Sequence, residues 1–108
     1  MPATLTEQEF SKHLKTKFRV NSENPFELQL TEVEGYLTKE NEQSGMERFS
    51  IFFLGPENRF LPQGVYSLEH ERMGAFELFL VPIARGEGSV RYEAVFNHLK
   101  QTGNSITT

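Results

Sequence analysis

The sequence predicts a mainly β domain of the α+β type: an antiparallel meander that forms a small barrel or a twisted roll, with one helix at its N-terminus. Apolar side chains recur at every second position through most of residues 18–97, which is the period of a half-buried strand. The turns between these runs are too short for the crossover that parallel strands require. The 108 residues have the size of one domain, so we expect a single domain over residues 1–108.

The composition limits the classes of function. The chain has 15 acidic and 11 basic residues, a net charge of −4, so it lacks the excess of Lys and Arg that binds nucleic acid through its phosphates. No apolar run reaches the roughly 20 residues of a membrane span, and no leader-like segment opens the sequence. The absence of Cys excludes disulfides and thiolate metal sites. We expect a cytoplasmic protein with no cofactor and no metal, and neither nucleic acid nor a membrane as partner.

A helix is predicted over about residues 7–15. The segment Thr6–Glu9 has the form of a capping box, and Leu5 and Phe10 have the spacing of a hydrophobic staple around it. Only Phe10 and Leu14 form an apolar pair at i, i+4. Such a narrow apolar stripe requires the helix to pack against a sheet face.

The strands are predicted to begin at Phe18 and to end near residue 97. Alternation over Phe18–Val20 and Phe26–Thr31, with turn residues between, indicates a hairpin. The polar segment Thr38–Gly45 is typical of a solvated loop. A third strand follows over Met46–Leu54, and Gly-Pro turn signals end it.

Three further strands complete the predicted sheet. They cover Val65–Glu71, Ala75–Ile83 and Val90–Phe96. The second of these is apolar on both faces, which predicts the most buried strand, and Pro82 near its end marks a bulge or the strand terminus. The Gly-rich segment before the last strand predicts a hairpin turn rather than a phosphate loop, because a strand and not a helix follows it. The tail over about residues 101–108 is expected to be loose.

The richest polar cluster is Glu69–Arg72, which has residue types suited to a general base or to metal ligands. Strand alternation places Glu69 and Glu71 on one face and His70 on the other. The two other histidines show no spacing typical of a metal site. The simpler interpretation is a strand end with solvated or paired charges.

Several short segments of the sequence resemble those of a family of small bacterial domains of unknown function. The resemblance covers about Phe10 to Asn97, and the segments that carry it are Glu47-Arg48-Phe49-Ser50, Leu61-Pro62-Gln63-Gly64, Glu69-His70, Leu78–Ile83 and Tyr92–Asn97. It implies no activity and no catalytic residue, because members of the family have none assigned. Neighbouring genes for phage-tail-like or collar proteins are expected from the resemblance, which implies an accessory or assembly role.

Four polar residues within these segments are not explained by turn geometry or by aromatic packing: Arg48, Gln63, Glu69 and His70. These four, together with Tyr92, are the candidate ligand-binding residues. No residue is predicted to be catalytic.

The predicted function is a non-enzymatic interaction or accessory domain that offers a sheet edge or an aromatic patch to a protein partner. A weak homodimer through an edge strand is expected if the meander does not close. The alternative is a small barrel whose mouth binds a small ligand. An enzyme would require His70 and a carboxylate to converge.

Overall fold

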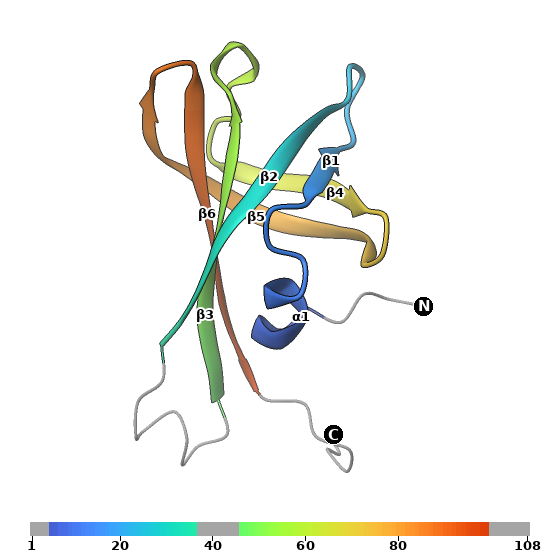
Figure 1. The fold of residues 1–108 in the computed structure, drawn as a ribbon, viewed down its shortest axis with the longest axis vertical. Coiled ribbons are helices and arrows are strands. Elements are labelled where there is room, and N and C mark those ends of the chain that lie inside the picture. The colour runs from blue at the N-terminus through green and yellow to red at the C-terminus, as the bar shows by residue number, and fades with distance from the viewer. Residues whose placement is uncertain (1–4, 37–45, 100–108) are drawn as a thin grey trace.

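The computed structural model describes residues 5–36 and 46–99, which form one short helix and six strands closed into an antiparallel barrel (Figure 1). The fold class predicted from the sequence is therefore confirmed. The predicted loop over Thr38–Gly45 and the predicted tail over 101–108 lie outside the described residues. Within the described part, no helix has the length and apolar character needed to cross a membrane.

The barrel consists of two three-stranded meanders. The strands are β1 (Lys17–Val20), β2 (Phe26–Gly35), β3 (Met46–Pro56), β4 (Gly64–His70), β5 (Gly74–Gly86) and β6 (Ser89–Leu99). Their order around the barrel is β1-β2-β3-β6-β5-β4. A continuous meander would pair β3 with β4, but β3 pairs with β6 instead, and a short 3-10 helix, η1 (Glu57–Arg59), lies on the connection from β3 to β4.

The helix α1 (Glu7–Ser11) begins where the capping box predicts. The Glu9 N–H donates to the Thr6 hydroxyl at 3.1 Å, which satisfies one of the amide groups left open at a helix start. The Glu9 carboxylate lies 3.6 Å from the Lys12 ammonium. The start of the helix is therefore a local property of the sequence.

The prediction that the helix continues to residue 15 is wrong. The His13 N–H donates to the Phe10 carbonyl at 2.9 Å, three residues back, and Lys15 has a positive φ of 69°. The Lys15 N–H donates to the Leu30 carbonyl of β2 at 2.7 Å. Pairing with β2 thus redirects the chain before a further helical turn forms.

Strand β5 changes neighbour along its length. Residues 74–80 pair with β4, and residues 81–86 pair with β6. The register shifts between Pro82 and Ala84, as the position of the proline predicts, since proline has no N–H for the ladder. The last pair of this ladder is Val81 with Glu93; past it β5 and β6 diverge, and the barrel is split between them.

Phe10 of α1 fills the inner side of this split. Its ring centre lies 5.4 Å from that of Phe96 on β6 and 6.0 Å from that of Phe76 on β5. The rings of Phe49 and Phe18 lie 6.2 and 6.3 Å away. Phe10 is completely buried. In Figure 1, α1 accordingly lies beside the part of β3 and β6 that extends past the other strands.

The barrel interior is filled by side chains. The inward-facing residues that are completely buried include Phe18, Leu28, Leu30, Phe49, Ile51, Phe53, Leu68, Leu80, Val90 and Tyr92. On the outer face of β3, Phe52 is covered by the Arg91 guanidinium, which lies 4.3 Å from its ring centre. Interiors of small barrels are usually filled in this way.

The prediction that Ala75–Ile83 is the most buried strand is wrong. Its inward residues Leu78 and Leu80 are buried, but Phe79 and Ile83 on the outer face are 50% and 43% exposed. No helix or second sheet layer covers the outer side of β5 in the described part of the chain. Apolar alternation on both faces thus indicates an apolar outer surface here rather than burial.

Phe10→Ala tests the role of the helix as a filler of the split. We expect a loss of about 3–5 kcal/mol in the free energy of unfolding, because a completely buried ring is removed from four aromatic neighbours. Urea denaturation measures it. The control Leu14→Ala, at a side chain that is 39% exposed, should cost less than about 1 kcal/mol. Equal effects of the two substitutions would contradict this role.

Candidate functional site

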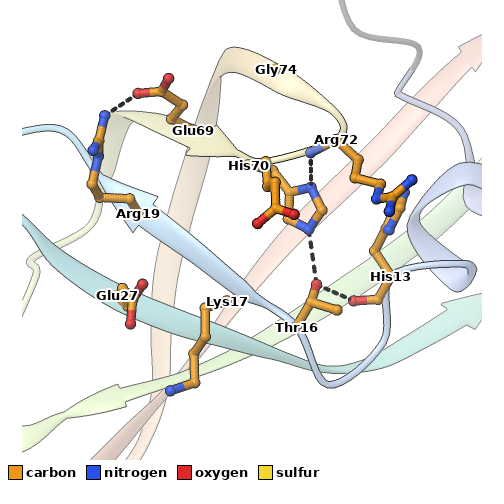
Figure 2. Close-up of a pocket in the computed structure, with 10 residues that line it drawn as sticks. His13, Thr16, Lys17, Arg19, Glu27, Glu69, His70, Arg72 and Gly74 are labelled. Carbon is orange, nitrogen blue, oxygen red and sulfur yellow. Dashed lines mark hydrogen bonds and ion pairs between the residues drawn. The ribbon is translucent and has the colours of Figure 1, made fainter.

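A surface pocket of about 690 Å³ opens where β1 and β4 part. The two strands pair only through Arg19 with Glu69 and Val20 with Leu68, so the chain before Arg19 separates from the β4–β5 turn. The lining residues are His13, Thr16, Lys17, Arg19, Glu27, Glu69, His70, Glu71, Arg72 and Gly74. Figure 2 shows them around His70, with Lys17 and Glu27 on one side and His13 and Arg72 on the other.

His70 is fixed in the pocket by hydrogen bonds to both ring nitrogens (Figure 2). The backbone N–H groups of Arg72 and Met73 donate to Nδ1 at 3.0 and 3.1 Å. Nδ1 is therefore the unprotonated nitrogen, and Nε2–H donates to the Thr16 hydroxyl at 2.9 Å. That hydroxyl donates in turn to the His13 carbonyl at 2.6 Å. Both nitrogens of a neutral His70 are satisfied.

The His70 ring also closes the core at this end of the barrel. Its centre lies 4.3 Å from that of Phe18 and 4.6 Å from that of His13. Burial lowers the pKa of His70 below its ordinary value of 6.5, and the nearby His13 lowers it further. Protonation would also place a proton on Nδ1, which already accepts two N–H groups. The structure thus holds His70 as a neutral, structural histidine.

The carboxylate next to His70 belongs to a surface ion pair. Glu69 is exposed on the outer face of β4 and pairs with Arg19 of β1, while His70 points inward. The Arg19 side chain also donates to Asn21 at 3.1 Å. In this structure Glu69 and His70 are on opposite faces of one strand, as the alternation in the sequence predicts.

The other three predicted site residues do not reach this pocket. Arg48 is exposed on the outer face of β3, and Gln63 is exposed in the segment before β4. Tyr92 is completely buried, and its hydroxyl accepts the Leu61 N–H at 3.0 Å. The structure thus brings together only two of the five residues, and a ligand-binding role for any of them stays a prediction.

Sequence reasoning singled out the lining residues of the Glu69–Arg72 cluster but did not find those from the N-terminal part of the chain. His13 and Thr16 lie between α1 and β1, and Lys17 begins β1, all more than fifty residues before His70. No local pattern links segments so far apart. A signal was present only for Arg19, because a charged residue between the apolar Phe18 and Val20 must face outward.

A hydroxyl chain on the outer face of the sheet is a further polar cluster. Tyr36 donates to the Ser50 hydroxyl at 2.9 Å, and Ser50 donates to the Glu93 carboxylate at 2.7 Å. Ser50 is completely buried, so a substrate has no access to its oxygen. Within residues 5–36 and 46–99, no three His, Asp or Glu side chains lie close enough together to hold a metal ion.

The edge of β6 over residues 94–99 is the second candidate site. No described strand pairs with these residues on the side away from β3, because β5 has already diverged. Val95 on this edge is 66% exposed, the most exposed of the large apolar side chains in the described part of the chain. An unpaired strand edge is a template for pairing with another chain.

The register determines which amide groups face this edge. The Tyr36 N–H donates to the Arg48 carbonyl, so the amide groups of Arg48 face β2. Those of the next residue, Phe49, face β6, because amide directions alternate along an antiparallel strand. Phe49 pairs with Phe96, so the amide groups of Phe96 face β3. The N–H and C=O groups of Val95 and Asn97 consequently point away from β3, toward the open edge.

The equivalent edge of β2 is protected. The Glu7 carboxylate of α1 lies against Gly35, where it would collide with any side chain. Glu32 and Glu34 add charge along that strand, which is a common protection of edge strands. Residues 94–97 of β6 carry no charge. Of the two edges, the β6 edge is the one that the sequence leaves unprotected.

Residues 5–96 match the family model described as Domain of unknown function (DUF6916). The chain belongs to this family. The resemblance to a small domain family of unknown function is thereby confirmed. No curated protein and no solved structure matches the chain. The family match begins before α1 and extends into β6, so it includes both the helix that fills the split and most of the barrel.

The low pKa of His70 predicts an acid-sensitive fold. Well above pH 6.5 the His70 ring is neutral in both the folded and the unfolded state, so its titration does not change the free energy of unfolding. As the pH falls below 6.5, the unfolded chain binds a proton that folded His70 does not, so stability is lost until the pH passes below the native pKa. Urea denaturation from pH 8 to pH 5 should show this loss in the wild type and a smaller one in His70→Gln.

The control for this series is His13→Gln. It should keep most of the loss, because burial is the larger cause of the low pKa of His70 and His13 the smaller. Parallel pH profiles for the wild type and His70→Gln would contradict a neutral His70.

Proposed function

We propose that this domain is a non-enzymatic protein-interaction domain, of an accessory or assembly type, that binds an extended segment of a protein at the open edge of β6. The observation that carries the proposal is that the outward backbone groups of Val95 and Asn97 have no partner among the described strands, next to the 66% exposed Val95 side chain. Addition of a strand would pair these groups and cover the side chain.

The polar clusters support binding over catalysis. A general base needs a free nitrogen or carboxylate at the substrate. Both nitrogens of His70 are engaged in hydrogen bonds, and Glu69 pairs with Arg19. Ser50 is hydrogen bonded and completely buried. These groups are used to stabilise the fold.

The filled interior also supports a surface function over the alternative of a ligand-binding barrel. A barrel that takes a small ligand needs an internal cavity. The rings of Phe18 and Phe53 lie 5.3 Å apart in the centre of this core, and both are completely buried. The pocket beside His70 is lined by polar and charged residues and does not enter the core.

We also propose an assembly role and a cytoplasmic location for the domain. An interaction domain without chemistry of its own suits an assembly role such as the phage-tail-like one that the resemblance implies. The cytoplasm is the proposed compartment, because a cysteine-free chain needs no oxidising environment for its stability.

The test is a binding measurement with matched edge and surface variants. Proteins captured by the immobilised domain are identified, purified and titrated back against it. We expect Val95→Lys to weaken binding at least about tenfold, because it puts a charge inside the new ladder. The control Leu54→Lys replaces another apolar side chain, 38% exposed on the outer face of β3 and away from the split, and should leave the affinity unchanged. Equal losses in both variants, or no loss in either, would contradict the proposal.

A further inference from the structure

We propose that the strand bound at the β6 edge is β6 of a second copy of this chain, which gives a two-fold symmetric dimer with one continuous sheet. This inference rests on the proposed function, since it names the occupant of the same edge. The sequence predicted a homodimer through an edge strand only if the meander stayed open; the present proposal places the dimer contact at the β6 edge of a closed barrel. Although the barrel is closed around its ring of strands, the split between β5 and β6 leaves residues 94–99 of β6 without a described partner on the side away from β3.

The alternation of amide directions limits the register of such a dimer. Only residues whose N–H and C=O groups face the open edge can form its hydrogen-bonded pairs, and over residues 94–99 these are Val95, Asn97 and Leu99. The proposed register uses the first two. An antiparallel arrangement centred on Phe96 pairs Val95 of each copy with Asn97 of the other. Every outward amide group of these two residues is then satisfied. Glu93 is excluded from the ladder, because it already pairs with Val81 of β5.

Charge distinguishes the two edges as sites of self-pairing. Each protein chain has a net charge of −4, so two copies repel one another overall, and a contact run without charge adds no further repulsion. The contact run Ala94–Asn97 has no charged residue, and antiparallel pairing therefore places no like charges opposite one another. Self-pairing through β2 would bring Glu32 and Glu34 of both copies together. Of the two edges, the uncharged one is suited to a second copy.

The outer face around Val95 provides apolar surface for this contact. Val81 of β5 pairs with Glu93, so Phe79 and Val95 lie two residues further along the two diverging strands, on the same outer face. Phe79 and Val95 are 50% and 66% exposed. A second β6 strand enters the space that β5 leaves, and its side chains lie beside this surface. Burial of apolar area then adds to the hydrogen bonds.

Sedimentation velocity over a range of protein concentrations tests the dimer. We expect a monomer–dimer equilibrium for the wild type. Val95→Lys and Asn97→Lys should each raise the dissociation constant at least about tenfold, while Leu54→Lys, on the outer face of β3 and away from the split, should leave it unchanged. Urea denaturation of each variant verifies that it is folded. A wild type that stays monomeric at every concentration would overturn the dimer, as would equal dissociation of the Leu54→Lys variant.

Disulfide crosslinking tests the register independently, because the chain has no cysteine of its own. Hydrogen-bonded pairs in an antiparallel ladder have Cα atoms about 5.5 Å apart, within the range of a disulfide. The double variant Val95→Cys with Asn97→Cys should therefore form a covalent dimer on mild oxidation. The single variants should not, because each new cysteine then lies opposite a residue without a thiol. Crosslinking of the single variants alone would contradict the register.

The two proposals fail in distinguishable ways. If the wild type is monomeric but Val95→Lys still weakens binding of another captured protein, only the choice of a second copy as occupant is wrong. If Val95→Lys changes neither the dissociation constant nor the binding of any captured protein, the β6 edge is not the binding site and the proposed function also fails.

Discussion

The packing of Phe10 into the space where β5 leaves β6 is the interaction on which the rest of this structure depends. Without it, the inner ends of β3, β5 and β6 would expose the rings of Phe49, Phe76 and Phe96, all of which lie near Phe10. A five-residue helix is too short to be stable alone, so helix and sheet stabilise one another. The helix closes the split on the inner side of the barrel, but no described strand pairs with the outer hydrogen-bonding edge of β6 over residues 94–99.

The buried polar side chain of His70 joins two segments at the edge of the filled core. His70 joins the β4–β5 turn to the segment before β1, through Nδ1 on one side and Thr16 on the other. It does so at the end of the barrel where β1 and β4 share only two register pairs. A buried polar group that is fully hydrogen bonded fixes a single arrangement of the segments it joins. The hydrogen bonds of His70 therefore compensate for the short ladder between β1 and β4, whereas the proposed binding edge is on a different strand, β6.

The sequence was sufficient for features that depend on near neighbours. The capping of α1 by Thr6, the bulge at Pro82 and the inward position of His70 all follow from spacing within a few residues. The turn of Glu87 and Gly88, both with positive φ, also follows, since glycine favours that conformation in a two-residue hairpin. Features set by distant segments could not be predicted: the pairing of β3 with β6, the contact of Thr16 with His70, and the early end of α1, where Leu30 captures Lys15. The exposure of Phe79 was missed because alternation reports which residues share a face and not what covers that face.

The central claim is that the barrel splits between β5 and β6 and leaves the amide groups of Val95 and Asn97 without a partner among residues 5–36 and 46–99. Residue-resolved hydrogen exchange at the lowest practical protein concentration measures this most directly. The account predicts an alternating pattern along β6, with slow exchange at Ala94 and Phe96, whose N–H groups face β3, and fast exchange at Val95 and Asn97. Exchange at Val95 and Asn97 as slow as at Phe96 under these conditions would show that their N–H groups are bonded within the monomer, and would contradict the account.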